Sequence, residues 1–129
     1  MRFYVSTSFL NQAAAVAFAA ELVRRGHELT CAWWDLAKRV NEVGLDGIAR
    51  REIQAICACE IFVLLCPGRL GSHVELGAAI ALATPLIIVV GEPEPHTDCV
   101  FYALPTVRRC VTVEEALAII DLQSGTISD

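Results

Sequence analysis

Two uninterrupted apolar runs constrain the fold of this chain more than any other feature of its sequence. They occupy residues 61–66 (IFVLLC) and 86–91 (LIIVVG). A run without polar alternation is typical of a strand that is buried on both faces, as in parallel sheets covered by helices on each side. We predict an apolar helix over 73–84, which would supply the crossover that a parallel pair needs. The two runs therefore predict a right-handed βαβ unit.

Strand and helix patterns alternate along the rest of the chain as well. We predict further strands over 2–7, 27–34 and 108–113, further helices over 10–26, 48–60 and 113–122, and loops over 35–47 and 92–98. In the first helix we expect Leu10, Ala14, Ala17 and Leu22 to form the packing face. This order of elements predicts an α/β fold with a doubly wound parallel sheet of about five strands, arranged as a Rossmann- or flavodoxin-like three-layer sandwich.

The size and composition of the chain favour one domain that associates with copies of itself. A length of 129 residues suits a single domain over 1–129, with a frayed polar tail over 123–129. Hydrophobic residues make up 55% of the chain and charged residues only 19%. Because so apolar a surface is better covered than exposed, we predict a homo-oligomer, at least a dimer.

Charge, hydropathy and motifs argue against several functional classes. The net charge is −5 and there is no basic run, so we expect no nucleic acid polymer as a partner. The apolar stretches are too short to span a membrane, and neither a GxGxxG nor a P-loop motif is present. The six cysteines form no CxxC pair. We therefore expect reduced thiols in a cytoplasmic protein and no metal or other cofactor.

Glu75 is an unexpected charge near the start of the apolar helix in residues 67–84 (PGRLGSHVELGAAIALAT). One interpretation is structural, because Ser72 and Glu75 have the spacing of a capping box. The other is chemical. Parallel sheets bind ligands beyond the carboxyl ends of their strands, where we expect 6–9, 33–35, 67–72 and 91–94 to converge. An ionised carboxylate at that edge would suit attack on the anomeric carbon of a sugar.

The segment around Glu75 resembles a known enzyme family. A strand followed by PG-x-x-GS and HVELGAAIAL is similar to the nucleoside 2-deoxyribosyltransferase superfamily, which includes deoxynucleoside-monophosphate N-glycosidases. The resemblance covers roughly residues 2–91 and, more weakly, 100–121. It implies that Glu75, in the ELG motif, is the nucleophile and that Tyr4, in 3–12 (FYVSTSFLNQ), positions it. Glu52 and Glu60 stand where the family usually carries Asp, and Glu52 is our candidate for the second catalytic carboxyl group.

The resemblance also implies a binding site for a nucleoside or a nucleoside monophosphate. Arg69 stands where the transferases carry Asp, and a cation in a glycine turn suits an anion such as a phosphate. The related monophosphate hydrolases bind phosphate through serines, and one of the two tryptophans could stack on a base. The predicted substrate-binding residues are Ser6, Ser8, Phe9, Trp34, Gly68, Arg69, Gly71 and Ser72.

The predicted activity is cleavage or transfer of an N-glycosidic bond, and two alternatives remain open. Residues 67–75 (PGRLGSHVE) are also similar to the PGGxGTxxE turn of cytokinin-activating phosphoribohydrolases, although Arg69 replaces a glycine there. The second alternative is a non-catalytic nucleotide-binding or sensing module of the same fold. In that case Glu75 would serve only as a cap or as an acceptor for a sugar hydroxyl.

Overall fold

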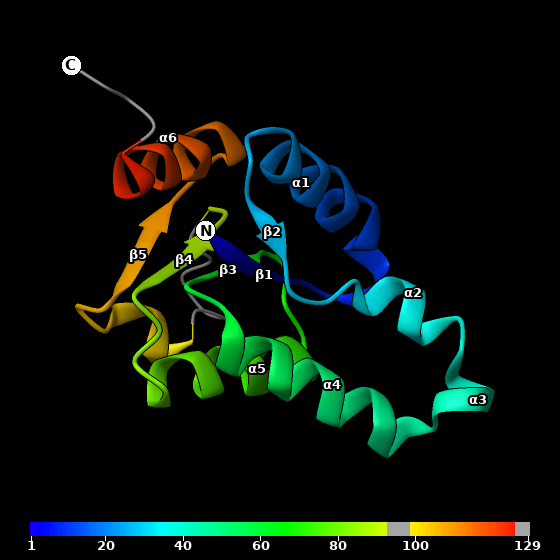
Figure 1. Cartoon of the computed structure of the whole chain (residues 1–129). Helices are drawn as coiled ribbons and strands as arrows, with labels where there is room; N and C mark the ends of the chain where they lie inside the picture. Colours follow the sequence, from blue (N-terminus) through cyan, green and yellow to red (C-terminus); the bar gives the residue numbers. More distant parts are fainter. Residues whose placement is uncertain (93–98, 126–129) are drawn as a thin grey trace.

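The computed structural model describes residues 1–92 and 99–125, and its centre is a five-stranded parallel sheet (Figure 1). The strand order is β2-β1-β3-β4-β5, so the chain runs outward from β1 to β2 and then, after a crossover, to the other side. The strands are β1 (Arg2–Ser6), β2 (Glu28–Leu29), β3 (Ile61–Leu65), β4 (Leu86–Val90) and β5 (Val107–Cys110).

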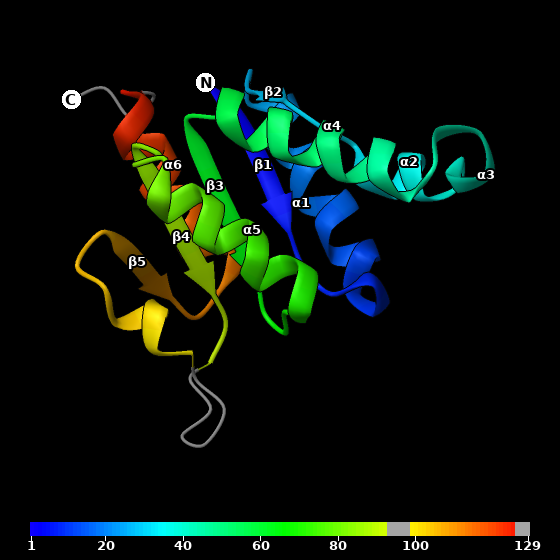
Figure 2. The same cartoon turned by 90° about the horizontal axis from the view of Figure 1, so that it is seen from below.

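Helices cover both faces of the sheet and complete a three-layer sandwich. In the two views α1 and α6 lie on one face, and α4 and α5 lie on the other (Figures 1 and 2). The predicted doubly wound α/β class is therefore confirmed. The helical elements are the 3-10 turns η1 (Phe9–Asn11) and η2 (Val100–Ala103), and the helices α1 (Gln12–Arg24), α2 (Trp33–Ala37), α3 (Val40–Val43), α4 (Leu45–Ala58), α5 (Leu70–Ala81) and α6 (Val113–Ser124).

The two apolar runs form the central strands, as predicted. Every residue of β3 and of β4 is buried, and the two strands pair in parallel with Val63 opposite Ile88. β1 pairs with the other edge of β3, with Tyr4 opposite Phe62. The rings of that pair stack with centroids 5.9 Å apart. The carboxyl ends of β1, β3 and β4 consequently point to the same edge of the sheet.

The predicted strand over 27–34 is mostly wrong. β2 contains only Glu28 and Leu29, and Trp33 and Trp34 begin the helix α2. Both indoles are buried, and the Trp33 indole N–H donates to the carbonyl of Val5 at 2.7 Å. A helical turn next to β1 can bury two consecutive large rings, whereas a strand would direct them to opposite faces. The predicted loop over 35–47 accordingly contains most of α2, all of α3 and the start of α4.

The packing face of α1 also differs from the prediction. The buried residues are Ala15, Phe18, Ala19 and Leu22, whereas Leu10 is 85% exposed and the predicted alanines at 14 and 17 are exposed. The observed stripe has the i, i+3, i+4, i+7 spacing of a helix on a sheet. Leu22 is buried as predicted, Leu10 lies in η1 before the helix begins, and the predicted positions 14 and 17 each precede a buried residue by one.

The remaining boundaries concern the ends of the chain and the loop after β4. Thr112 caps α6 by accepting a hydrogen bond from the Glu115 amide at 3.1 Å, and the helix ends before Gly125 in a left-handed conformation. Most of the predicted loop over 92–98, and residues 126–129 of the predicted tail, lie outside the described residues. Within the described part, no helix has the length and apolar character needed to cross a membrane.

Candidate active site

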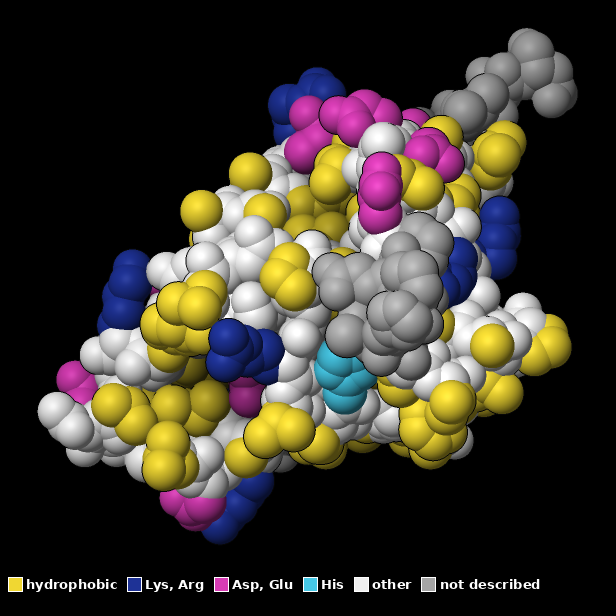
Figure 3. All heavy atoms as spheres, turned by 180° about the vertical axis from the view of Figure 1, so that it is seen from behind, with side chains coloured by type: hydrophobic (Ala, Val, Ile, Leu, Met, Phe, Trp, Pro, Cys, Tyr) yellow, Lys and Arg dark blue, Asp and Glu magenta, His cyan; other side chains and the backbone are white. Residues whose placement is uncertain are grey.

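A cavity of about 480 Å³ opens at the carboxyl ends of β1 and β3, between the turn after β1, α4 and the start of α5. In Figure 3 hydrophobic side chains are prominent over the lower half of the molecule, and acidic ones gather at the top. The cavity is mixed in character, with an apolar wall, two carboxylates and one guanidinium. Its lining residues are Thr7, Ser8, Phe9, Trp33, Ala49, Glu52, Ile53, Arg69, Gly71, Ser72, Val74 and Glu75.

Glu75 is held by two hydroxyl groups from β1. The Tyr4 hydroxyl donates to Oε2 of Glu75, and the Ser6 hydroxyl donates to Oε1 at 2.7 Å. Tyr4 and Ser6 are two residues apart on one strand, so both side chains point to the same face of the sheet, and both are fully buried. The tyrosine predicted to position Glu75 therefore does contact it.

The predicted capping box between Ser72 and Glu75 is wrong. α5 begins at Leu70, so Ser72 lies in its first turn and Glu75 in its second. The Ser72 hydroxyl accepts from the Arg69 amide at 2.6 Å and donates to the Arg69 carbonyl at 3.0 Å. The Ser72 hydroxyl is thus bonded to the backbone of Arg69, the residue before the helix, and not to the backbone at Glu75. The Glu75 carboxylate contacts β1 instead. The structural interpretation of Glu75 thus fails, and its carboxylate lies at the cavity.

Glu52 places a second carboxylate in the same cavity. It lies on α4 with Ala49 and Ile53, which share the cavity-facing stripe at helical spacing. Burial, followed by the charge of Glu75, raises the pKa of Glu52 to about 7. Burial also raises the pKa of Glu75, although the hydrogen bonds from Ser6 and Tyr4 oppose that rise. The two carboxyl groups therefore compete for ionisation, as the acid and the base of a catalytic pair often do.

Tyr4 and Cys31 lie close to these carboxylates, and both stay protonated at neutral pH. Burial and the charge of Glu75 raise the pKa of Tyr4, so its hydroxyl remains a donor. Burial and the charges of Glu52 and Glu75 raise the pKa of Cys31 to about 11. A thiol in that state is a poor nucleophile. Cys31 is therefore not a candidate nucleophile, and the two carboxyl groups remain the candidates for acid–base and nucleophilic roles.

Phe9 and Trp33 form an aromatic wall of the cavity. Their ring centroids are 6.5 Å apart with the planes inclined by 45°. Trp34, the predicted base-stacking residue, does not line the cavity. It is buried behind Trp33 with its ring edge-on at 5.2 Å. The assumption of a strand over 27–34 led to the choice of the wrong tryptophan, since only the position of α2 shows which indole reaches the cavity.

The predicted phosphate-binding residues separate into two groups. Ser8, Arg69, Gly71 and Ser72 all line the cavity near the start of α5. Ser6 does not belong to this group, because its hydroxyl is bonded to Glu75. Four further lining residues were not predicted individually. Thr7 and Val74 lie within the motifs at 3–12 and 67–75, whereas no motif marks Ala49 and Ile53.

Gly68 and His73 shape the turn in which Arg69 lies. A Cβ on Gly68 would lie 2.8 Å from Ser72 Oγ and 3.1 Å from His73 Cε1, so the turn is too tightly packed there for a side chain. Gly68 does not line the cavity, and its predicted contact with substrate is not supported. His73 Nδ1 lies 2.7 Å from the Arg69 carbonyl and Nε2 lies 2.7 Å from the Tyr102 hydroxyl. Since a carbonyl only accepts, Nδ1 carries the proton and Tyr102 donates to Nε2.

Glu60 lies outside the site. It is at the amino end of β3, where its carboxylate accepts from the Arg2 amide at 3.0 Å.

A larger groove of about 640 Å³ runs beside β2 and is rimmed by Arg2, Arg39 and Arg51. Two of these arginines contact carboxylates nearby, at 3.8 Å for Arg2 with Glu60 and 3.2 Å for Arg39 with Glu42. We therefore place the candidate active site at the cavity of Glu75.

The described residues contain no group of His, Cys, Asp or Glu side chains arranged to hold a metal ion.

A scan of the sequence against protein-family models gives no match, and neither does a search of curated proteins. A comparison with solved structures finds the CMP N-glycosidase BcmB of Clostridium botulinum, with 18% sequence identity and a TM-score of 0.66. The match covers 94% of this chain and 99% of that one. The likeness shows that the two chains share a fold.

Proposed function

We propose that this chain is an enzyme that cleaves the N-glycosidic bond of a nucleoside monophosphate, with Glu75 as the nucleophile. The observation that carries the proposal is the pair of buried hydroxyls from Tyr4 and Ser6 that hold the Glu75 carboxylate at the cavity. Two further facts support it: the family resemblance of the ELG segment, and the shared fold with a CMP N-glycosidase. A carboxylate fixed by hydroxyls in a cavity is arranged to attack carbon, because no ion pair among the described residues neutralises its charge.

The reaction would proceed in two steps with retention at the sugar. One oxygen of Glu75 attacks C1′ while the C1′–N bond breaks, and its electron pair goes to the base. Glu52 gives its proton to the departing base, as the raised pKa of that carboxyl group allows. Water then attacks C1′ of the glycosyl ester, its proton returns to Glu52, and Glu75 leaves as a carboxylate. A second base in place of that water would give transfer instead of hydrolysis.

The cavity provides separate surroundings for the base and the phosphate of such a substrate. Phe9 and Trp33 offer aromatic surfaces on which a base can stack. Arg69 and Ser8 line the cavity near the start of α5, where a guanidinium and a hydroxyl group suit a phosphate. The Ser72 hydroxyl lines the same side but is bonded to the backbone of Arg69. No ion pair among the described residues uses Arg69. Its charge therefore remains available to an anionic ligand.

The surface around the cavity favours a second copy of the chain as the partner. Phe9 is 63% exposed, Leu70 89% and Val74 66%, and Phe9 and Val74 line the cavity itself. Covering them by a neighbouring subunit would remove apolar surface from water and narrow the entrance of the site. Light scattering should show at least a dimer at micromolar concentration, and a monomer would contradict this part of the proposal.

The central test is the release of free base from a panel of ribo- and deoxyribonucleosides and their 5′-monophosphates, with CMP included. We expect release from at least one monophosphate, and we expect Glu75→Ala to abolish it while calorimetry shows that binding persists. Binding without release from any compound would indicate the non-catalytic module. Release confined to ribonucleoside monophosphates with an adenine-type base would indicate a phosphoribohydrolase.

A further inference from the structure

The two hydroxyl groups that hold Glu75 differ in whether they also interact with Glu52. Tyr4 donates to Glu75 and also lies close enough to Glu52 for each to affect the ionisation of the other. Ser6 donates to Oε1 of Glu75 at 2.7 Å, and among the described residues no hydrogen bond joins it to Glu52. Ser6 is thus the donor that binds Glu75 and not Glu52. Its side chain is fully buried, so water does not reach the place of its hydroxyl.

The difference matters because Glu75 and Glu52 compete for a single proton. Two carboxyl groups in one cavity repel each other when both are ionised, so one of them holds its proton to a higher pH. The charged and titratable groups that face Glu75 are Tyr4 from β1, Glu52 from α4, Cys31 before α2, and Arg69 along the cavity. Tyr4 and Cys31 stay protonated, so neither supplies a charge that would favour Glu75 over Glu52.

We propose that Ser6 is a positioning residue whose hydroxyl fixes the Glu75 carboxylate and leaves the shared proton of the pair on Glu52. This inference rests on the proposed function and assigns the two carboxyl groups their states. A hydrogen bond to a carboxylate stabilises the ionised form. Ser6 therefore favours an ionised nucleophile and, through the resulting charge, a protonated acid. Both states are needed at the same pH for the first step.

Without the Ser6 hydroxyl, neither Glu75 nor Glu52 would hold the protonation state that its role in the reaction needs. Glu75 would lose one of its two donors and would hold a proton more readily, while Glu52 would face less negative charge and would lose its proton more readily. A protonated nucleophile and an ionised acid are both inactive. The loss of one hydroxyl that we do not expect to touch the substrate should therefore change the pH dependence of the reaction as well as its rate.

The experiment compares Ser6→Ala, Ser6→Cys and the control Thr84→Val. Thr84 is another buried hydroxyl, between α5 and β4, and it lies beside Cys59 away from the cavity. The carboxyl carbons of Glu75 and Glu52 are followed by carbon-13 NMR titration, assigned with Glu75→Gln and Glu52→Gln. In Ser6→Ala we expect the Glu75 midpoint to rise by about one pH unit and the Glu52 midpoint to fall. The weaker thiol donor of Ser6→Cys should give a smaller shift.

Kinetics provide the second readout. In Ser6→Ala the acidic limb of kcat/KM should move to higher pH with the Glu75 midpoint, which lowers kcat/KM about tenfold on that limb. Thr84→Val should leave both the limb and the NMR midpoints in place. An unchanged Glu75 midpoint in Ser6→Ala, or an equal shift in Thr84→Val, would overturn the inference. Ser6→Cys serves the same purpose if the alanine variant does not fold.

The two proposals can fail separately. If no compound is cleaved and the Glu75 midpoint still rises in Ser6→Ala, the proposed function falls while Ser6 retains its effect on the proton. If Glu75→Ala abolishes base release and Ser6→Ala changes neither the midpoint nor the pH profile, the function stands and the role of Ser6 is wrong.

Discussion

Acidic side chains at the two ends of the parallel sheet have opposite shifts of their pKa. At the carboxyl end, Glu75 and Glu52 lie partly buried, hydroxyls donate to Glu75, and burial raises the pKa of both. At the amino end, Glu60 accepts from the Arg2 amide, and this bond holds its pKa below the usual range. The pKa of this residue type is therefore raised at one end of the sheet and lowered at the other.

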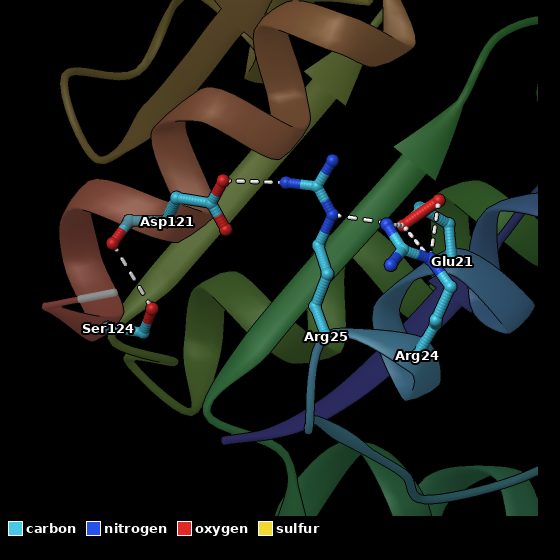
Figure 4. Close-up of polar contacts among 5 residues, drawn as sticks. All are labelled: Glu21, Arg24, Arg25, Asp121 and Ser124. Atoms are coloured by element: carbon cyan, nitrogen blue, oxygen red, sulfur yellow. Dashed lines mark hydrogen bonds and ion pairs between the residues drawn. The ribbon is translucent and has the colours of Figure 1, made fainter. Parts of the chain in front are cut away.

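The amino end also carries an ion-pair network that joins two helices (Figure 4). Arg25 contacts Glu21 of α1 at 3.1 Å and Asp121 of α6 at 2.6 Å, and Arg24 also pairs with Glu21. No ion pair among the described residues includes Glu52 or Glu75. Charges that are neutralised in pairs can stabilise the packing of helices, whereas a carboxylate held by neutral donors keeps its charge for a substrate.

The largest expected effect is on kcat/KM, which should depend on Glu52 and not on Glu60. Because the pKa of Glu52 is raised to about 7, the acid is protonated below that pH, and kcat/KM should fall as the pH rises through 7. Glu52→Gln should remove this basic limb and lower kcat/KM by roughly 10²- to 10⁴-fold, as is usual for the loss of a general acid. Glu60→Gln should leave the rate and the profile unchanged. Equal losses in both variants would contradict the contrast between the two ends.

The next effect tests the anion side of the cavity. Arg69→Ala should weaken binding of a nucleoside monophosphate about ten- to a hundredfold, the range expected for a charged hydrogen bond. Binding of the matching nucleoside should change little, and calorimetry with the two ligands measures both. Equal losses for the nucleoside and its monophosphate would show that Arg69 does not contact the phosphate.

A smaller effect is expected at the amino end, on stability alone. The Arg25 and Asp121 side chains are 28% and 15% exposed, and Oδ1 of Asp121 is buried with no hydrogen-bond partner among the described residues. Arg25→Ala should lower the free energy of unfolding by about 1–2 kcal/mol in urea titration. Arg24→Ala is the matched control, because its side chain is 70% exposed, and it should cost less than about 0.5 kcal/mol. Neither variant should alter kcat/KM.

The smallest expected effect is the stability cost of the raised pKa of Glu52. This pKa is about 7 in the fold against 4.5 for an exposed carboxyl group. The folded state therefore binds more protons between these values, and stability should decline as the pH rises through this window. Glu52→Gln should flatten the decline by less than about 1 kcal/mol, since half of the side chain is screened by water. Melting temperatures from pH 5 to 8 for both proteins measure it, and parallel curves would count against a buried carboxyl group.

Local pattern was enough to predict part of the fold and part of the site. The buried runs over 61–66 and 86–91 could only be central strands, because uninterrupted apolar sequence needs cover on both faces. The likeness of the ELG segment and of FYVSTSF to a known family pointed to Glu75 and Tyr4, which the structure brings together. The strand over 27–34 could not be placed, since short apolar segments near a strand end fit a helix as well as a strand. The face of α1 could not be placed because its many alanines give the hydrophobic periodicity little contrast.

The sequence by itself determined the layers of this protein, the order of its main elements and the identity of the carboxylate at its centre. Only the tertiary structure decided that α5 begins at Leu70, so that Glu75 faces β1, and that Ser6 serves this carboxylate instead of a phosphate. It also decided that Trp33, and not Trp34, reaches the cavity. The physical reason is that periodicity records which face of an element is buried, whereas the partner of a buried polar group depends on elements distant in the chain.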